Sequence, residues 1–449
     1  MSNIILSSDS YKYSQFNQYP KNTEFVYSYI ESRGGEYDKL VFFGTQMFLK
    51  EYMSKPITQD DIDEAEDVIT AHGLPFNKDG WEYILNAHNG YLPVEVKALD
   101  EGSVVTPKLV LLTIVNTDAK CWWLTSFLET ALLKAIWYPT TVASNSYKSK
   151  KIIKKYLDLT GDVTGLPFKL HDFGFRGVSS RESAGIGGLA HLVNFQGTDT
   201  IEALMYGRKY YDVDMAGFSI PATEHSTITS WGRSGEVDAY SHVVDLYSKP
   251  DSIYSCVSDS WDFNQACHYW GTALKDKVIS SGGTLVVRPD SGIPEVVVPE
   301  GMDILESYYG HTLNSKGYKV LNNVRMIQGD GIGHDSIESI LWILKEKGYS
   351  ADNIAFGQGG GLLQSLDRDT CRFAMKCSAI RVSGEWRDVY KDPVGDKGKR
   401  SKKGRFSVVN SDNGYITGVY GDDGDLLTQR FYNGELINTT TFDEVRLRS

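Results

Sequence analysis

Cysteine is scarce and unpaired in this sequence of 449 residues. The five cysteines are an odd number with no Cys-x-x-Cys pair, which argues against a disulfide framework and a structural zinc site. No apolar run reaches the roughly 18 residues of a membrane-spanning helix. The N-terminus also lacks the basic and apolar segments of a signal peptide. We therefore expect a soluble cytoplasmic protein without a membrane partner.

Several common catalytic signatures are missing as well. The sequence contains no Gly-x-Ser-x-Gly, no His-Glu-x-x-His and no Cys-His nucleophile pattern. Its net charge of −12 argues against a general nucleic-acid binder. The composition, with 41% hydrophobic and 23% charged residues, is that of a globular protein, and the length predicts two domains.

Strand and helix patterns alternate from about residue 166 onward. Strands are expected at 168–170, 253–257, 284–287, 324–327 and 354–356, with helices at 200–211, 262–278, 336–347 and 362–369. Such alternation favours parallel strands in an α/β fold, and five or more units favour a (β/α) barrel. The active site of a barrel lies at the carboxyl ends of its strands.

The rest of the chain has different patterns. The N-terminal third mixes helices and short strands, including a helix that Thr58 and Asp61 would cap and a second helix over 121–137. Alternating apolar and polar residues over 406–442 predict a closing antiparallel meander.

The segment 171–180, His-Asp-Phe-Gly-Phe-Arg-Gly-Val-Ser-Ser, follows an apolar stretch at 166–170. An aromatic side chain and a cation after a strand suit a flat ring held beside an anion. The alternative is a glycine-rich turn with a packed phenylalanine.

Other strand ends carry glycine, arginine or aspartate. Backbone N–H groups at 357–364 could hold a phosphate, with Arg368 nearby, unless the glycines only form a turn. Three carboxylates at strand ends could hold ribose hydroxyls or Mg²⁺, or could cap helices instead. They are Asp259, Asp290 and Asp330.

The segment 391–405 holds seven cations against two aspartates in an otherwise acidic chain. It fits either a clamp for a polyphosphate or a solvated loop.

Taken together, these segments closely resemble the nicotinamide phosphoribosyltransferases, type II phosphoribosyltransferases of NAD salvage. The resemblance runs from Asp9-Ser10-Tyr11-Lys12 to Phe442-Asp443-Glu444. It is densest at 171–180, 191–195, 197–200, 221–227, 288–292, 328–331, 359–364 and 391–405.

The resemblance implies a (β/α) barrel catalytic domain over residues 161–380 beside a second α/β domain. Residues 1–160 would form the N-terminal part of that second domain. Residues 381–449 would supply the basic loop and strands that return to it. The family also implies a homodimer with active sites at the interface, ATP as co-substrate and Mg²⁺ as cofactor.

The resemblance further assigns roles to individual residues. Phe173 and Tyr11 of the other subunit would stack on the pyridine ring, Asp199 would accept a hydrogen bond from its carboxamide, and Arg288 and Asp290 would flank it. The ribose and phosphate would contact Asp290, Gly329, Asp330, Gly359, Gly360 and Arg368. The pyrophosphate would contact Arg176, His225, Arg288, Lys376, Lys391 and Lys399.

Three expectations concern chemistry. The catalytic residues would be His225, Asp290 and Arg288, with His225 phosphorylated during ATP-coupled turnover. Asp259 is the expected contact for Mg²⁺ carried by pyrophosphate. Ala374 replaces a frequent family serine at the 5′-phosphate, which would weaken that contact.

Two alternatives remain. A nicotinate phosphoribosyltransferase would share the chemistry, but the carboxylate of Asp199 would repel an acidic substrate. A catalytically silent binding or signalling protein would not need Asp199, Asp290, Arg288, His225 and the basic loop together. Asp199 itself could instead cap the helix that starts near Thr200.

Overall fold

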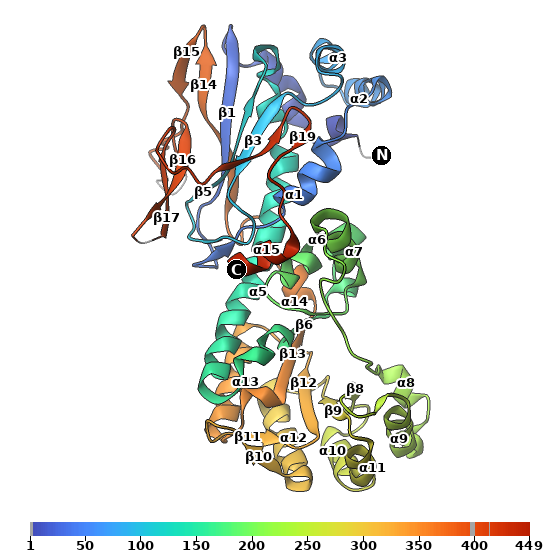
Figure 1. Ribbon diagram of the computed structural model, residues 1–449. Coiled ribbons are helices and arrows are strands. Elements are labelled where there is room, and N and C mark those ends of the chain that lie inside the picture. The colour runs from blue at the N-terminus through green and yellow to red at the C-terminus, as the bar shows by residue number, and fades with distance from the viewer. Residues whose placement is uncertain (1–2, 396–399, 413) are drawn as a thin grey trace. The chain divides into compact units, whose positions relative to one another are not determined.

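The structure is a computed structural model that describes residues 3–395, 400–412 and 414–449 (Figure 1). The chain forms two compact units, each with its own hydrophobic core. Unit 1 comprises residues 1–144, 209–213 and 366–449, and unit 2 comprises 145–208 and 214–365. The sequence predicts boundaries after residues 160 and 380. The first change of unit instead falls inside the continuous helix α5 (Glu129–Thr160), where no loop marks it in the sequence.

Unit 1 contains a seven-stranded antiparallel sheet in the order β15-β14-β1-β5-β3-β18-β19. Its strands are β1 (Thr23–Ser32), β3 (Val94–Ala98), β5 (Val110–Asn116), β14 (Phe373–Val382), β15 (Glu385–Asp388), β18 (Thr428–Tyr432) and β19 (Glu435–Leu436). Strand β1 pairs with β14, so the two ends of the chain share one sheet. The second α/β domain is therefore built from the N-terminal third and the C-terminal segment, as predicted.

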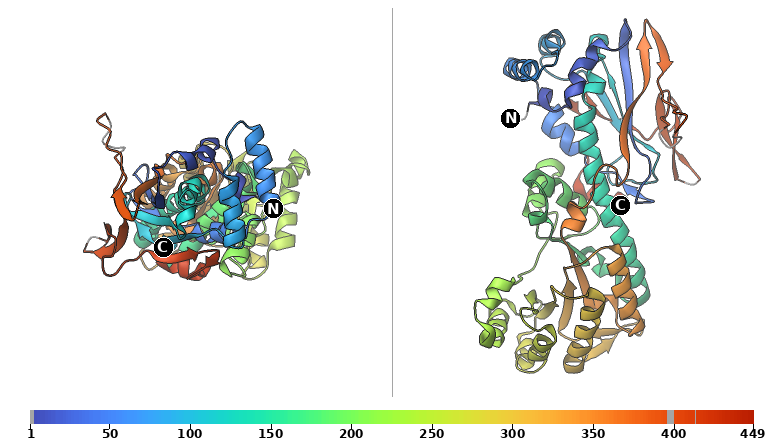
Figure 2. Two further views of the ribbon diagram at one scale, coloured as in Figure 1. Left: turned by 90° about the horizontal axis from the view of Figure 1, so that it is seen from above. Right: turned by 180° about the vertical axis from the view of Figure 1, so that it is seen from behind.

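Helices cover one face of this sheet, and the β16–β17 hairpin lies against the other (Figures 1 and 2). The hairpin strands are β16 (Phe406–Ser411) and β17 (Gly414–Val419), and a further pair is β2 (Leu40–Val41) with β4 (Val104–Val105). The α-helices are α1 (Thr45–Phe48), α2 (Gln59–Ala71), α3 (Lys78–Ala87), α4 (Leu124–Phe127), the first half of α5 and α15 (Phe442–Arg448). The 3₁₀ helices are η1 (Ile4–Leu6), η2 (Ser10–Asn17) and η4 (Ala119–Cys121), and η3 (Leu49–Met53) is a π-helix.

The start of α2 confirms the predicted cap. The Thr58 hydroxyl accepts a hydrogen bond from the Asp61 N–H, and the Asp61 carboxylate accepts one from the Thr58 N–H. The predicted helix over 121–137 is instead two helices, because α4 ends at Phe127 before α5 begins at Glu129.

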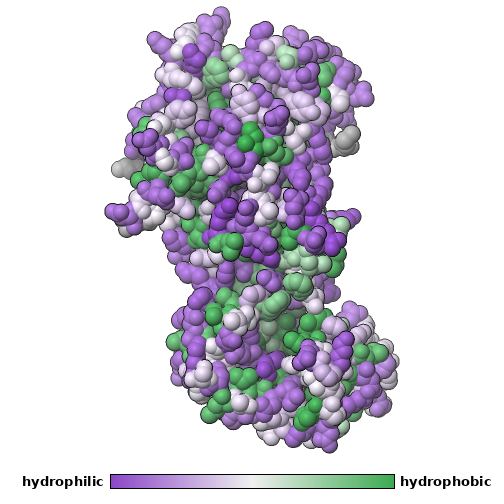
Figure 3. Space-filling model, in the orientation of Figure 1, coloured by the Kyte–Doolittle hydropathy of each residue, from purple (hydrophilic) through white to green (hydrophobic). Residues whose placement is uncertain are grey.

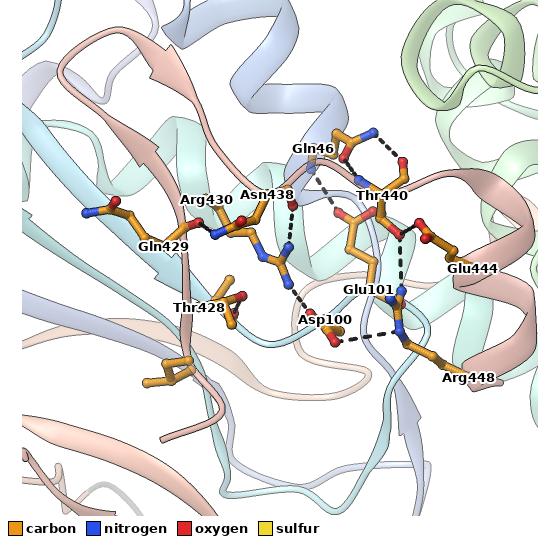
Figure 4. Close-up of polar contacts among 12 residues, drawn as sticks. Gln46, Asp100, Glu101, Thr428, Gln429, Arg430, Asn438, Thr440, Glu444 and Arg448 are labelled. Carbon is orange, nitrogen blue, oxygen red and sulfur yellow. Dashed lines mark hydrogen bonds and ion pairs between the residues drawn. The ribbon is translucent and has the colours of Figure 1, made fainter. Parts of the chain in front are cut away.

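Polar contacts hold the C-terminal segment against the rest of unit 1 (Figure 4). Arg430, on β18, and Arg448, on α15, both pair with Asp100. The side-chain amide of Gln46 donates to the Thr440 carbonyl at 2.9 Å and accepts from its N–H at 2.8 Å. These contacts explain how a short helix at the chain end keeps a fixed position.

Unit 2 contains six parallel strands in the order β7-β6-β13-β12-β9-β8. They are β6 (Leu170–Asp172), β7 (Gly197–Thr198), β8 (Ile253–Val257), β9 (Thr284–Arg288), β12 (Val324–Gln328) and β13 (Ile354–Gln358). The segment 218–223 bonds to both edges, with Phe218 on Gln196 and Thr198, and Thr223 on Ser255. This irregular segment closes the sheet, so the predicted barrel-like architecture is confirmed.

Helices surround the strands (Figures 1 and 2). They are the second half of α5, α6 (Arg181–Leu192), α7 (Ile201–Tyr211), α8 (His225–Thr229), α9 (Glu236–Tyr247), α10 (Phe263–Gly271), α11 (Lys275–Ser281), α12 (Pro294–Tyr309), α13 (His334–Glu346) and α14 (Gly360–Leu363). Remaining elements are η5 (Val163–Phe168), η6 (Phe175–Gly177), η7 (Arg233–Gly235), η8 (Ala351–Asn353), β10 (His311–Leu313) and β11 (Lys319–Leu321). In the part of the chain that the structure describes, no helix has the length and apolarity to cross a membrane.

Three sequence predictions in unit 2 were wrong in detail. The stretch before Leu170 is mainly the 3₁₀ helix η5, since Pro167 cannot donate to a strand. The helix expected over 262–278 breaks at Thr272 between α10 and α11. The helix expected over 362–369 is only α14, after which the chain turns.

Candidate active site

The ring of Phe173 lies on glycine backbone at the end of the parallel strands. The Phe173 N–H, directly after β6, donates to the Gln358 carbonyl of β13 at 3.0 Å. A Cβ atom added to Gly357 would lie 1.9 Å from the Phe173 ring, and one added to Gly329 would lie 3.0 Å from it. The ring therefore needs glycine at 357, and it packs beside the imidazole of His171 at a centroid distance of 5.2 Å.

The carboxylate of Asp199 is held by two side chains. Its Oδ1 atom lies 2.9 Å from Nε2 of His171 and accepts a hydrogen bond from the Ser219 hydroxyl at 2.6 Å. Among the described residues, no backbone N–H of α7 donates to this carboxylate, so Asp199 does not act as the cap considered above. Burial alone would raise the pKa of Asp199, but the two hydrogen bonds outweigh it and hold the pKa below its usual value. Asp199 is thus an anion at neutral pH.

These side chains line a cavity of about 440 Å³ that lies inside the barrel of unit 2. Figure 3 shows apolar residues gathered around a hollow over the sheet of this unit. Phe173, Asp199, Ser219 and Arg288 line the cavity together with apolar side chains of β8, β9, β12 and β13. An apolar cavity with a few polar groups is the usual form of a small-molecule site.

Arg288 ends strand β9 and reaches this cavity. Its Nε atom is buried and has no hydrogen-bond partner among the described residues. A buried guanidinium donor without an acceptor is costly in a folded protein, so an anionic or carbonyl ligand would satisfy it.

His225, Asp259 and Asp290 form a connected group. Nε2 of His225 lies 2.9 Å from Oδ1 of Asp259, and Nδ1 lies 3.8 Å from Oδ2 of Asp290. The other oxygen of Asp259 accepts from the Asp290 N–H at 3.0 Å and from the Ser291 hydroxyl at 2.6 Å. The side chain of Asp259 is only 3% exposed and that of His225 is 44% exposed. The buried carboxylate of Asp259 therefore orients the accessible imidazole of His225, as the aspartate does in catalytic His–Asp pairs.

The remaining expected residues of unit 2 lie on loops after strands. Gly329 follows β12, and a Cβ there would lie 3.8 Å from a carboxylate oxygen of Asp290. Asp330 is exposed. Gly360 begins α14 with no heavy atom within 4 Å of a Cβ placed there, which leaves its backbone open to a ligand. Arg176, on η6, is exposed to solvent.

Unit 1 carries the other expected residues. Tyr11, on η2, is 58% exposed, and the Lys12 ammonium lies 5.3 Å from its ring centroid. Arg368 is exposed and pairs with Asp369 at 3.1 Å. The Lys391 N–H donates to the Ser401 hydroxyl at 2.9 Å. Ala374 is buried in β14, and Lys399 lies outside the described residues.

Lys376 belongs to a cluster of cations on unit 1. Its ammonium lies 3.7 Å from a carboxylate oxygen of Glu129, which also pairs with Lys12. Burial lowers the pKa of Lys376, and three neighbouring cations act in the same direction. These cations are Arg33, Lys391 and Lys12. Such a concentration of positive charge fits a site for a polyanion.

Sequence reasoning missed several residues that complete these groups. It gave no role to His171 or Ser219, which hold Asp199, or to Glu129, which holds Lys376. It also missed Arg33, whose buried Nε and one terminal nitrogen have no hydrogen-bond partner among the described residues. The pair Gly34-Gly35 directly after Arg33 was the available signal, since glycine also directly follows Phe173, Arg176 and Asp330.

Comparisons with known proteins agree with this geometry. Residues 168–435 match the nicotinate phosphoribosyltransferase (NAPRTase) family, and residues 3–96 match the N-terminal domain of nicotinamide phosphoribosyltransferase. A nicotinamide phosphoribosyltransferase of Xanthomonas campestris pv. campestris is 50% identical over 99% of this chain and 98% of its own length. The chain belongs to the nicotinamide phosphoribosyltransferase family. A second relative with this name, from Acinetobacter baylyi, is 32% identical over 99% of this chain and 97% of its own length.

Solved structures of related proteins share the fold of this phosphoribosyltransferase family member. A nicotinate-nucleotide pyrophosphorylase from Pyrococcus furiosus has a TM-score of 0.64 at 16% identity, covering 99% of this chain and 94% of that one. Human nicotinic acid phosphoribosyltransferase has a TM-score of 0.57 at 15% identity, covering 99% and 92%. At these identities the likeness concerns the fold alone.

Proposed function

We propose that this chain transfers the 5-phosphoribosyl group from phosphoribosyl pyrophosphate to nicotinamide, giving nicotinamide mononucleotide and pyrophosphate in NAD salvage. The observation that carries the proposal is the ionised carboxylate of Asp199, at the wall of an apolar cavity beside Phe173 and Arg288. Nicotinamide offers a flat ring for Phe173 and an amide N–H₂ group that donates to Asp199. The full-length similarity to nicotinamide phosphoribosyltransferases supports the same substrate.

In this proposal each group at the strand ends has one task. Phe173 stacks on one face of the ring, and Tyr11 of a second subunit stacks on the other. Arg288 donates to the carboxamide or to the leaving pyrophosphate, which would satisfy its buried Nε. Asp290, Asp330 and the open backbone at Gly329, Gly359 and Gly360 hold the ribose and its phosphate, with Arg368.

The reaction needs positive charge more than a protein nucleophile. The lone pair of the ring nitrogen forms a bond to C1 of the ribose, and the C1–oxygen bond breaks with its electrons leaving on pyrophosphate. The transition state resembles an oxocarbenium ion, and its leaving group gains negative charge. Arg176, His225, Arg288 and the lysines Lys376, Lys391 and Lys399 would neutralise that charge.

Magnesium fits this site as a companion of pyrophosphate. When bound, it would supply further positive charge to the leaving group. Both oxygens of Asp259 already accept protein hydrogen bonds, so Asp259 would serve through His225 rather than at the metal. Asp290 and the exposed Asp330 have oxygens that could contact the hydrated ion.

ATP coupling, dimer formation and location complete the proposal. His225 would accept a phosphoryl group from ATP, supported by its exposure and by Asp259 behind it. Exposed Tyr11 would complete the site of a homodimer partner. Five free thiols fit a reducing cytoplasm.

The test is a product assay with phosphoribosyl pyrophosphate and either nicotinamide or nicotinate, each with and without ATP. We expect nicotinamide mononucleotide, with ATP increasing its yield. The second candidate, a nicotinate phosphoribosyltransferase, is favoured by the broader family match over residues 168–435. A clear preference for nicotinate would establish that alternative, and no product from either would indicate a silent binding protein.

A further inference from the structure

Unit 1 contains a second cavity, of about 220 Å³, between its sheet and the β16–β17 hairpin. Strands β1, β3 and β5 form its floor, and aromatic side chains form much of its wall. The aromatic residues are Phe25, Tyr27, Trp386, Phe406, Tyr420 and Tyr432. None of its lining residues has a task in the phosphoribosyl transfer proposed above.

Arg405 is held in this cavity by two aromatic rings. The central carbon of its guanidinium lies 4.5 Å from the ring centroid of Trp386 and 4.1 Å from that of Tyr420. Contacts this close on two rings restrict the guanidinium plane. Among the described residues, no carboxylate or carbonyl accepts a hydrogen bond from this guanidinium. Its planar set of N–H donors therefore remains available for a carboxylate or phosphate.

Lys97, on β3, adds a second cation to the lining. It makes no ion pair or hydrogen bond through its ammonium with any residue that the structure describes. The two acids of the lining are engaged by protein donors. Glu95 accepts from the Gln429 amide at 2.6 Å, and one oxygen of Asp425 accepts the N–H groups of Val408 and Leu427. These donors are neutral, so the two acids balance the charges of Lys97 and Arg405, but the N–H donors of the two cations have no acceptor among the described residues.

We propose that this cavity binds a small planar aromatic molecule that bears a carboxylate or a phosphate. Its ring would pack on the side chains of Phe25 and Tyr27, and its anionic group would contact Arg405 and Lys97. The volume is below the roughly 300–1,000 Å³ of sites for drug-sized ligands, which limits the occupant to one ring system with one anionic group.

The test is isothermal titration calorimetry of the full chain with two probes, each added at saturating nicotinamide. Indole-3-acetate represents an aromatic carboxylate and phenyl phosphate an aromatic phosphate. We expect at least one probe to bind with a Kd below about 1 mM. The probe that binds more tightly identifies which anionic group the site prefers.

Variants distinguish this cavity from the candidate active site. Lys97→Met should weaken binding by about tenfold, as for one lost charge-assisted hydrogen bond. Arg405→Lys, which keeps the charge but loses the planar fork, should also weaken it. Lys21→Met, an exposed change elsewhere on unit 1, and Asp199→Ser should leave it unchanged. The proposal would be overturned if neither probe bound the wild type. It would also be overturned if Lys97→Met and Arg405→Lys both bound the probe as tightly as the wild type does.

Discussion

Nε2 of His171 lies 2.9 Å from Oδ1 of Asp199, and the Ser219 hydroxyl donates to that same oxygen. The second oxygen, Oδ2, accepts no hydrogen bond from any residue that the structure describes. The protein thus fixes the orientation of the carboxylate through one oxygen and leaves the other as an acceptor. This arrangement favours a substrate with an N–H group over one with a carboxylate, because a second anion would be repelled.

Replacing Asp199 with serine should therefore change substrate choice. A hydrogen bond to a charged group contributes roughly 1.5–3 kcal/mol. Nicotinate loses this bond and is also repelled. The kcat/KM of the wild type should therefore be on the order of a hundredfold or more higher for nicotinamide than for nicotinate. Asp199→Ser should lose nicotinamide activity and gain on nicotinate in the product assay.

The matched control is Asp214→Ser, which removes an exposed aspartate of the same unit. It should keep the wild-type preference. If Asp199→Ser also kept a wild-type preference for nicotinamide, specificity would have to reside in other residues.

A second prediction concerns the contact between Phe173 and Gly357. Phe173→Ala should weaken ring binding by about 1–3 kcal/mol, which is the usual size of such aromatic contacts. Gly357→Ala should also raise the KM for nicotinamide, because its new Cβ would lie 1.9 Å from the ring and displace it.

The double variant tests the mechanism of this effect. Once Phe173 is alanine, Gly357→Ala has no ring to displace, so its additional effect on KM should nearly vanish. Fully additive effects of the two changes would mean that Gly357 acts on nicotinamide binding by another route.

Much of the barrel could be predicted from sequence, but not the segment that closes it. The strands at 253–257, 284–287, 324–327 and 354–356 are apolar runs bounded by polar residues, so their pattern was visible. The segment 218–223 contains Pro221 and pairs only at single residues, so no strand pattern marks it. The change of unit inside α5 was equally invisible, because a helix shows its own period whichever core it contacts.

The candidate site shows the same division. Phe173, Asp199, Arg288 and Asp290 follow or end strands, so their convergence could be predicted from topology. The contact of Asp199 with His171 spans 28 residues, and its contact with Ser219 spans 20. No local pattern specifies such pairs, since they depend on how the strands are ordered in the sheet.

A third prediction concerns the pair His225–Asp259. Asp259→Asn keeps the size of the side chain but removes the negative charge that would stabilise a phosphorylated imidazole. Basal transfer should persist, whereas stimulation by ATP and labelling by γ-phosphate-tagged ATP should fall sharply. Ser291→Ala removes only a hydroxyl that donates to Asp259 and should cause a much smaller loss. Wild-type labelling of Asp259→Asn would exclude a role for this carboxylate in phosphorylation.

Lys169 should make stability depend on pH. Its ammonium donates to the carbonyls of Ala351, Asp352 and Ile354, and burial lowers the pKa of Lys169 to about 8. Because the unfolded chain binds this proton up to a higher pH, the free energy of unfolding should rise with pH above about 8. The expected slope is up to about 1.4 kcal/mol per pH unit between pH 8 and 10.

Lys169→Met removes this contribution. As the pH rises from 8 to 10, the free energy of unfolding of the wild type should therefore increase relative to that of the variant. Urea unfolding at pH 7.5, 8.5 and 9.5 measures it, with Lys155→Met as an exposed control. A difference that stays constant with pH would show that Lys169 has an ordinary pKa in the folded protein.

The last prediction tests whether two subunits share each active site. Tyr11 lies on unit 1 and is 58% exposed, so its ring is accessible to a second subunit. Tyr11→Ala and Asp290→Ala should each abolish most activity alone. In a mixed dimer, however, one site combines the intact Tyr11 of one subunit with the intact Asp290 of the other. Random mixing makes half of the dimers mixed, each with one intact site of two, so activity should return to about a quarter of wild type. Differently tagged subunits, co-purified after mild unfolding and refolding, give the fraction of mixed dimers directly. If mixed dimers form but stay inactive, Tyr11 must act within its own subunit or outside the site altogether.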